Sequence, residues 1–373
     1  MKLGILTYHR AENYGALLQA YALRTYLKRH VEKVEFVDYW PDYHREHYKV
    51  FSWKKLKKQN FKGKMSYLVY FFIFAIFKYQ RKNKINKFLR RHLNLGSVIT
   101  YKTDQDICKE FDIVVYGSDQ IWRKQDVLSK IGYNPWYFGN ANVEASRKIS
   151  YAGSMGVIAS DINEILLLKK NFVNFDVISV RELDLQKFLS DLGFDVRLVI
   201  DPVFLLNKKE WRKLTQVRKI ASSERYILFY NLLNTPESND FVNTLQVKMK
   251  LPVKEINMKL DFAHLGVKYI KSASVEKFLS LIDNAEFVVT NSFHGTAFSI
   301  IFEKQFYAVG LRDKSSRVCS LLELVGIRER YIEDITMPIN DDNIDYVEVN
   351  TRLHEVVEYS KSFLIENIVD EKK

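Results

Sequence analysis

The stretch Val288-Val-Thr-Asn-Ser-Phe-His294-Gly-Thr-Ala-Phe-Ser-Ile-Ile-Phe302 contains the repeating unit of this fold. An apolar β-type run leads into a polar turn, and a second apolar run of helical length follows at once. Strands that are apolar on both faces are typical of a parallel sheet covered by helices. Gly295 permits a tight backbone passage at the turn. The stretch therefore predicts a strand, turn and helix of a parallel α/β domain.

The same order of elements recurs through the 373 residues. In the second half we expect strands at Tyr226–Leu232, Val253–Asn257, Phe287–Thr290 and Phe306–Val309. Helices are expected between and after them, at Ser238–Lys250, Val275–Ala285, Gly295–Phe302 and Val318–Val325. In the first half, apolar runs predict strands at Leu3–Tyr8, Val34–Tyr39, Ile113–Gly117, Ile149–Ala152, Val177–Val180 and Arg197–Ile200. Helices are predicted at Gly15–Arg29, Asp161–Phe172 and Leu183–Leu192.

This alternation predicts two Rossmann-like α/β domains with a cleft between the carboxyl ends of their sheets, a GT-B-like architecture. We place the first domain at residues 1–207, with a basic aromatic insertion at about 49–92. The second domain is placed at residues 208–350. It begins with a basic, polar stretch near residues 208–224, and its strands follow that stretch. A final helical segment at residues 351–373 is expected to fold back across the first domain. Two cores are expected from a chain of this length.

The composition is that of a globular protein, with 47% hydrophobic and 27% charged residues. There are only two cysteines, Cys108 and Cys319, and the N-terminus runs directly into a strand-like segment. These features predict a cytoplasmic protein, with an alternative in which it is peripheral on the inner face of the cell membrane. The net charge of +12 indicates attraction to an anionic partner. A nucleic-acid partner is not expected, because no nucleic-acid-binding module is recognisable.

Much of the positive charge lies between residues 49 and 91, around the aromatic run at residues 67–77. This run is well short of the ~20 residues that span a bilayer. It has no clean amphipathic period. Two interpretations remain open: the region lies at a bilayer surface, where anionic headgroups attract the bases, or it is a buried helix with a solvated basic end.

His294 is the sharpest candidate for chemistry. A helix that starts directly after a strand presents free backbone N–H groups, so Ser292 and Gly295 can help to hold an anion there. A histidine beside such a site can exchange protons near neutral pH. The competing interpretation is that His294 only caps the helix or fills a gap.

Three further strand ends carry polar groups. After the first strand, Asn13 and Gly15 allow an unusual turn that can hold a phosphate or a sugar. After the third, Gly117-Ser-Asp-Gln-Ile-Trp122 offers Ser118, Asp119 as a base or sugar partner, and Trp122 as a stacking surface; a helix cap with Trp122 in the core is equally consistent. Arg181, at a later strand end, has the planar fork that binds carboxylate or phosphate, or else forms a surface pair with Glu182.

A basic segment after the last predicted strand, with Arg312, Lys314 and Arg317, can form another anion site before a helix. The histidines and cysteines form no metal-ligand pattern, so neither a metal nor another cofactor is expected.

In order and wording, six segments resemble the polysaccharide pyruvyl transferase family over roughly residues 1–330. They are Asn13-Tyr-Gly-Ala-Leu-Leu-Gln19, Gly117-Ser-Asp-Gln-Ile-Trp122, Tyr151-Ala-Gly-Ser-Met-Gly156, Ser179-Val-Arg-Glu182, Asp201-Pro202 and Asn291-Ser-Phe-His-Gly295. The resemblance implies a transferase that moves pyruvate from phosphoenolpyruvate to a sugar of a polysaccharide or its lipid-linked precursor, as in capsule or exopolysaccharide synthesis. The product would be a pyruvate ketal on two sugar hydroxyls.

The resemblance also implies site roles. His294 and Asp119 would be catalytic, and Arg181, Ser292, Gly295, Arg312, Lys314 and Arg317 would bind the donor. The acceptor sugar would be bound by Asn13, Gly15, Ser118 and Trp122. One departure is that some family members carry an arginine shortly before the histidine, where this chain has Asn291, Ser292 and Phe293. Arg312, Lys314 and Arg317 are the substitutes available.

Two other functions fit the same pattern. A GT-B-type glycosyltransferase would bind a nucleotide sugar, with Glu276 or Glu286 placed for the ribose, and would ignore phosphoenolpyruvate. A non-catalytic protein that binds glycans or a membrane surface through residues 49–92 would be unaffected by the loss of His294.

Overall fold

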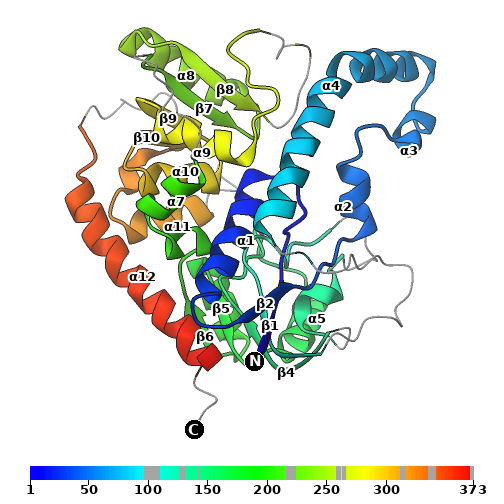
Figure 1. Cartoon of the computed structure of the whole chain (residues 1–373), viewed down its shortest axis with the longest axis vertical. Helices are drawn as coiled ribbons and strands as arrows, with labels where there is room; N and C mark the ends of the chain where they lie inside the picture. Colours follow the sequence, from blue (N-terminus) through cyan, green and yellow to red (C-terminus); the bar gives the residue numbers. More distant parts are fainter. Residues whose placement is uncertain are drawn as a thin grey trace.

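A computed structural model describes residues 1–93, 95, 110–125, 132–140, 143–215, 224–257, 262, 266–310, 316–334 and 342–369. In these parts the chain forms two α/β halves, each built on a parallel sheet (Figure 1). The predicted architecture of two Rossmann-like domains is therefore present, with the GT-B-like arrangement of two such halves around a central cleft.

The first sheet has the strand order β2-β1-β3-β4, and every pairing in it is parallel. A two-stranded ladder, β5-β6, continues it through isolated bridges from Ile149 to Val177 and from Gly153 to Val180. The strands are β1 (Lys2–Leu6), β2 (Lys33–Phe36), β3 (Glu110–Tyr116), β4 (Glu144–Ser150), β5 (Ile178–Val180) and β6 (Val196–Leu198). The helices that connect them are α1 (Tyr14–Leu27), α5 (Ile162–Phe172) and α6 (Leu183–Asp191).

The second sheet has the order β11-β10-β9-β7-β8 and is also parallel throughout. Its strands are β7 (Ile227–Asn231), β8 (Val253–Asn257), β9 (Phe287–Thr290), β10 (Gln305–Val309) and the short β11 (Tyr331–Ile332). Its helices are α8 (Pro236–Met249), α9 (Val275–Asp283), α10 (Phe293–Ile301) and α11 (Ser316–Leu324). The expected strands of both halves are present. Strand β11 was not predicted, because two residues are too few to show a strand pattern in the sequence.

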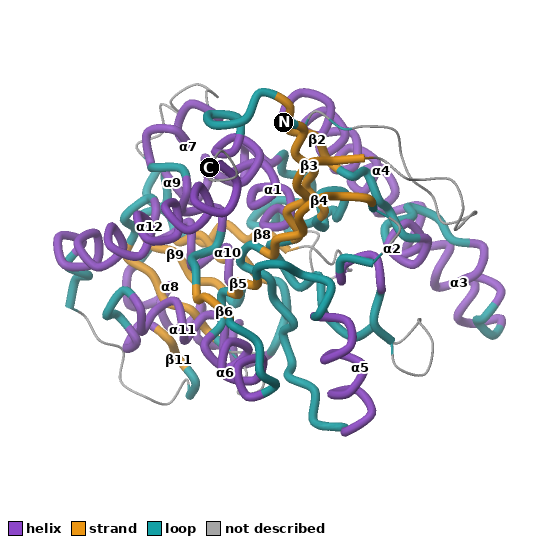
Figure 2. Tube along the Cα trace, turned by 90° about the horizontal axis from the view of Figure 1, so that it is seen from below, coloured by secondary structure: helices purple, strands orange, loops and turns teal. Residues whose placement is uncertain are grey.

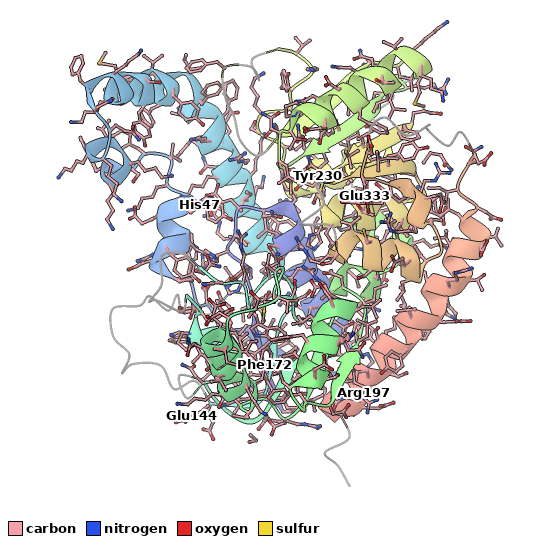
Figure 3. All side chains as sticks on the ribbon, turned by 180° about the vertical axis from the view of Figure 1, so that it is seen from behind. His47, Glu144, Phe172, Arg197, Tyr230 and Glu333 are labelled. Atoms are coloured by element: carbon pink, nitrogen blue, oxygen red, sulfur yellow. The ribbon has the colours of Figure 1, made fainter. Side chains whose placement is uncertain are left out.

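Each half has an apolar cluster of its own, but the largest cluster is shared between the halves, which the expectation of two cores did not include. One apolar cluster runs from β1 and α1 of the first half to α9 and α10 of the second. The reason is that α1 is buried on nearly all sides and packs against α9 across the boundary, where the Tyr14 ring stacks on Phe278 at 4.7 Å. Tyr230, labelled in Figure 3, closes the same aromatic group with its ring 4.8 Å from Phe278. The two halves therefore share their largest apolar cluster.

The basic, polar stretch at the start of the second domain contains a helix, α7 (Lys208–Leu214). Asn207 and Glu210 form a reciprocal capping box at its start, and Trp211 buries its ring in the shared core. The short one-turn helices η1 (Pro135–Phe138), η2 (Pro202–Leu205) and η5 (Arg328–Arg330) complete the connections.

The last helix, α12 (Tyr346–Val369), starts in the second half and runs down one side of the molecule to the first (Figure 1). Arg147 on β4 donates to the backbone and side-chain oxygens of Asn367, at 3.1 and 2.9 Å. Ser360 accepts from the backbone N–H of Ile200 at 3.0 Å. This helix therefore ties the end of the chain to the first sheet.

Residues 42–92 form three helices, α2 (Asp42–His47), α3 (Trp53–Lys57) and the long α4 (Phe61–His92). The C-terminal part of α4 packs on the first half through the buried Ile85, Phe88 and Leu89. Its N-terminal part and α3 extend away from both sheets as an arm, which lies at the periphery in two perpendicular views (Figures 1 and 2). Within the described residues, no helix combines the length and the apolar character needed to span a bilayer.

Candidate active site

A cavity of about 300 Å³ lies between the two halves, at the carboxyl ends of strands from both sheets. The first half contributes the α1 loop, the segment after β3 and the segment after β4. The second half contributes the ends of β9 and β10 and the start of α11. The polar side chains on its wall are those of Asn13, Asp119, Gln120, Arg123, Thr290, Asn291, Ser292, His294, Arg317 and Tyr331.

His294 enters this cavity from the first turn of α10. Ser292 caps the helix by accepting from the backbone N–H of Gly295 at 3.4 Å, which fixes the direction of the chain at the strand end. The imidazole lies directly over Gly15 of α1, where an added Cβ would be 2.1 Å from Nδ1. Gly15 is therefore the residue that makes room for the histidine ring, and this explains the need for glycine there.

On its other side, His294 faces a buried carboxylate. Its Nε2 is 3.7 Å from Oδ2 of Asp201 and, in the described part of the chain, has no hydrogen-bond partner. Oδ2 of Asp201 also accepts from the Ser118 hydroxyl at 3.2 Å and from the guanidinium of Arg181. Asp201 thus connects the histidine of the second half to an arginine of the first.

Arg181 is the centre of a buried charge cluster, which we define as Asp119, Arg181, Glu182 and Asp201. Its guanidinium is 3.7 Å from Asp119 and 3.5 Å from Glu182, and only 2% of its side chain is exposed. Its Nε and Nη2 have no hydrogen-bond partners among the described residues. The guanidinium lies 4.5 Å from the centre of the Phe293 ring. Arg181 does not line the cavity, whereas Phe293, against which its guanidinium packs, does.

The charges of this cluster depend on one another. Burial disfavours the ionised form of Asp201, but Arg181 and His294 outweigh it and lower the pKa of the carboxyl. Burial also opposes the charge of Arg181, but Asp201, Glu182 and Asp119 raise the pKa of its guanidinium. For Glu182 burial dominates, and its pKa is raised although Arg181 is close. Arg181, Glu182 and Asp201 are therefore held away from water, whereas Asp119 reaches the cavity wall.

The second half supplies a cation that is open to the cavity. Arg317, in the first turn of α11, lines the cavity and has no hydrogen bond or ion pair with the residues that the structure describes. Loss of water around it, together with the charge of Arg181, lowers the pKa of its guanidinium. Arg312 and Lys314, predicted for the same role, lie outside the described residues. Arg123, after β3, is a second arginine on the cavity wall.

Two predicted residues of the first half reach the cavity. Asn13 lines it while its side-chain oxygen accepts from the backbone N–H of Gly15 at 2.9 Å, which caps α1. Asp119 also lines it, in a left-handed backbone conformation with φ of 68°, and its carboxylate accepts from the N–H of Gln120 at 2.8 Å. In both residues one side-chain oxygen accepts a backbone hydrogen bond, and the side chain lies at the cavity wall.

Other predicted contacts need correction. Trp122 is fully buried and donates to the Tyr137 carbonyl at 2.8 Å, so it is a core residue and not a stacking surface for a sugar. Ser118 is also fully buried, and its hydroxyl is shared between Asp201 and the Ala152 carbonyl. Gly295 packs against Thr290, where an added Cβ would be 2.2 Å from its Oγ1. These three residues support the site from behind its wall.

Two residues of the site were missed as individual candidates. Asp201 follows a predicted strand end, the position shared by the other candidates, so this signal could have identified it. Arg123 directly follows the Gly117–Trp122 segment, and its positive charge is the signal that could have identified it. In the described part of the chain, no group of three or more histidine, cysteine, aspartate or glutamate residues is arranged to hold a metal ion.

Comparisons with solved structures return proteins of low sequence identity. The UDP-GlcNAc 2-epimerase from Methanocaldococcus jannaschii, in complex with UDP-GlcNAc and UDP, is 12% identical, with 98% of this chain and 99% of that chain covered and a TM-score of 0.47. The UDP-GlcNAc 2-epimerase from Neisseria meningitidis, bound to UDP-GlcNAc, is 10% identical over all of both chains, with a TM-score of 0.48. The heptosyltransferase WaaC from E. coli, with an ADP-heptose analogue, is 10% identical over 98% of this chain and all of that one, with a TM-score of 0.33.

No curated protein matches the sequence. A family model does match, over residues 13–313, and its description is polysaccharide pyruvyl transferase. The matched region includes every strand of both sheets except β1 and β11, together with Asn13, the charge cluster and His294. The chain that builds this cavity from both of its halves therefore belongs to the polysaccharide pyruvyl transferase family.

Proposed function

We propose that this protein transfers pyruvate from phosphoenolpyruvate to two hydroxyls of a sugar and forms a pyruvate ketal. The observation that carries the proposal is that His294 lies on the wall of one cavity between the two halves together with Arg123 and Arg317, whose side chains form no ion pair with the described residues. The donor carries a carboxylate and a phosphate, and the arginine side chains are suited to bind both. Family membership supports the reaction class.

The proposed reaction balances without a cofactor. A proton is added to carbon 3 of phosphoenolpyruvate, which makes carbon 2 electrophilic, and one sugar hydroxyl attacks carbon 2. The bond from carbon 2 to the phosphate oxygen then breaks, and the second hydroxyl attacks the same carbon. Two protons are consumed, one at carbon 3 and one on the departing phosphate. The two sugar hydroxyls release two protons, so the reaction is balanced.

We assign His294 as the acid that protonates carbon 3. Its ring reaches the cavity between Gly15 on one side and Asp201 on the other, so its orientation is restrained by both halves. Asp119, on the opposite wall, is assigned as the base for a sugar hydroxyl, and Asn13 as an acceptor contact.

We assign donor binding to Arg317, with Arg123 as the second cation. Arg317 would replace the arginine that some family members carry before the histidine, because the residues here are neutral. Ser292 accepts from the Gly295 N–H and Asn291 accepts from the Leu232 N–H. Arg181 is assigned as a positioning residue, since it binds Asp201 and packs against Phe293 without lining the cavity. Arg312 and Lys314 remain additional candidates.

We further propose that the sugar acceptor is lipid-linked and that the enzyme works at the inner face of the cell membrane. The basic arm formed by α3 and the first half of α4 supports this location, because clustered lysines are attracted to anionic lipid headgroups.

The test is the release of inorganic phosphate from phosphoenolpyruvate in the presence of free and lipid-linked sugars, followed by mass measurement of the product. Wild-type protein should release phosphate only with a matching acceptor. His294→Ala should reduce the rate by about 10²- to 10⁴-fold, the usual worth of a positioned acid or base. His354→Ala is the matched control, because this histidine is exposed on α12.

Phosphate release that persists undiminished in His294→Ala would remove the assigned acid. Binding of a nucleotide sugar with no phosphate release from phosphoenolpyruvate with any acceptor would replace pyruvyl transfer by glycosyl transfer. A protein that binds glycans equally well with and without His294, and releases no phosphate, would be a binding protein.

A further inference from the structure

The arm carries an exposed apolar stripe along the N-terminal half of α4. The residues of the stripe are Phe61, Met65, Val69, Phe72, Ile76 and Tyr79. Their spacing of three or four residues places them on one face of the helix, over about 27 Å of its length. Phe61 is 81% and Phe72 76% exposed, values far from those of core phenylalanines.

The opposite face of α4 makes the contacts that hold the helix on the protein. Phe74, Arg81, Ile85 and Phe88 are buried there, and the Phe74 ring packs 5.7 Å from that of Phe262. Both faces of the helix are therefore apolar over residues 67–77, and this is why the sequence has no clean amphipathic period. The stripe is not needed for the packing of α4.

The surroundings of the stripe are positively charged. Residues 47–93 contain fourteen lysines and arginines and no aspartate or glutamate. Six lysines on or beside α3 and at the start of α4 are exposed: Lys54, Lys55, Lys57, Lys58, Lys62 and Lys64. Figure 3 shows the side chains of this arm projecting into open space above His47. The exposed Trp53 lies among these lysines.

We propose that the stripe inserts into the surface of an anionic lipid bilayer, with the phenylalanines and aliphatic residues among the acyl chains and the lysines on the headgroups. Apolar side chains gain free energy when they leave water for the acyl region, and each basic residue near an anionic surface adds to the attraction. The stripe and the lysines together provide the two signals that stable attachment of a peripheral protein requires.

The charge and the apolar character of the arm favour a lipid bilayer over a second copy of this chain and over a nucleic acid. A second copy of this chain would bring an equally basic arm to the stripe, and like charges at close range oppose such a dimer. A nucleic acid would satisfy the lysines, but Met65, Val69 and Ile76 would gain nothing from phosphates and sugars. A bilayer satisfies both features.

The inference rests on one part of the proposed function, namely that the enzyme works at a membrane. It does not depend on the proposed reaction. Attachment and chemistry lie on different parts of the chain, since the stripe residues do not line the cavity. The two can therefore fail separately.

The experiment measures flotation of the full chain with vesicles of phosphatidylcholine, with and without phosphatidylglycerol. Wild-type protein should float with the anionic vesicles and be released by high salt. Phe72→Ser combined with Ile76→Ser should weaken binding by roughly tenfold or more. Replacing Lys54, Lys55, Lys57 and Lys58 by glutamine should abolish the preference for anionic lipid. The control, Val247→Ser on α8, removes an equally exposed apolar residue and should change nothing.

Fluorescence of Trp53 gives an independent readout. The rings of Trp122, Trp136 and Trp211 are buried, and the half-buried Trp40 is replaced by phenylalanine, so quenching by lipids brominated in their acyl chains should report mainly on Trp53. Circular dichroism and urea unfolding of the Phe72→Ser, Ile76→Ser variant should match those of the wild type, which shows that the chain is folded.

Three results would overturn the inference. One is equal flotation of the stripe variant and wild type. Another is a dimer of the free protein that the stripe variant abolishes. The third is absence of vesicle binding together with tight, salt-sensitive binding of single-stranded RNA. Loss of phosphate release with intact flotation would instead count against the proposed reaction.

Discussion

The arginines on the two sides of the cleft differ in whether they are paired with carboxylates. Behind the wall of the first half, Arg181 lies among Asp119, Glu182 and Asp201, and the guanidinium is almost completely buried. On the wall of the second half, Arg317 has no ion pair in the described part of the chain and lines the cavity. The same residue type is held in a network on one side and left available on the other.

This difference separates support from reaction. A buried, paired arginine cannot approach a ligand without leaving its carboxylates, and that would expose unpaired charges at a high cost in free energy. An arginine without a partner can bind an anion at no such cost. His294 joins the two sides, because it starts the second half's α10 and faces the first half's Asp201. Substitutions on each side should therefore change different measured quantities.

The largest effect is expected for Asp201→Asn. The change leaves Arg181 without its nearest counter-ion in a buried place, which typically costs 3–5 kcal/mol of folding free energy. The asparagine can still accept from the Val203 N–H, so the start of η2 is retained. Urea unfolding measures the loss, and phosphate release should fall as His294 loses its neighbour.

Asp195→Asn is the matched control. Asp195 pairs with Arg197 at 3.1 Å on the surface, where both side chains are more than half exposed. Exposed pairs contribute about 0–1 kcal/mol. Equal unfolding free energies for the two variants would show that the buried charge cluster contributes no more than a surface pair.

The next effect concerns the contact between the halves. In Gly15→Ala, the new Cβ would be 2.1 Å from Nδ1 of His294, so the ring must move. We expect kcat to fall by about 10²-fold, since a displacement of roughly 1 Å at a reacting group has this consequence. Gly63→Ala on α4 is the control, because its Cβ would meet the movable end of the Gln59 side chain. An unchanged kcat in Gly15→Ala would mean that the ring position is not critical.

The sequence predicted the fold better than the details of the site. Alternating apolar runs are a local signal, and they gave both sheets and most helices. Burial depends on the tertiary packing of the whole chain. Trp122 and Ser118 are buried, so they do not contact a ligand as predicted. His294, Asp119 and Arg317 lie at the cavity because strand ends and helix starts of a parallel sheet gather at one edge. Such topology can be anticipated from one sequence.

Contacts between the halves could not be anticipated in the same way. The fit of Gly15 against His294 joins residues far apart in the chain, and no local pattern encodes it. Asp201 is similar, because its role depends on Arg181 and His294 reaching it from two other elements. Arg181 was correctly placed at a strand end, but its packing against Phe293 is a tertiary feature.

A smaller effect is expected for the open arginine. Arg317→Ala should raise the half-saturating concentration of phosphoenolpyruvate by about 10- to 100-fold, the usual worth of a hydrogen bond to a charged group. Stability should change little, because Arg317 has no ion pair to lose among the described residues. Arg317→Lys should restore part of the affinity, since it keeps the charge but not the fork. Lys209→Ala, on the exposed side of α7, is the control.

The smallest effect is a difference in the pH dependence of stability. Burial raises the pKa of Glu182, so the folded state binds its proton more tightly than the unfolded state does. Stability from this group is therefore complete below the unfolded value of about 4.3 and is lost as the pH rises from there through the raised folded value. Asp201 acts in the opposite sense, because its lowered pKa makes stability fall as the pH drops below about 3.9.

Glu182→Gln separates the two contributions. Glutamine can still accept from the Ser154 hydroxyl, which lies 2.5 Å from Oε1 of Glu182, but it does not titrate. The variant should lose the decline of unfolding free energy above pH ~4.3 and keep the decline at lower pH that Asp201 causes. Urea unfolding across this range measures both, with the exposed Glu355→Gln as control. If the slope above pH ~4.3 persists in Glu182→Gln, another buried acid is responsible for it, and Glu12, whose pKa burial also raises, is the next residue to replace.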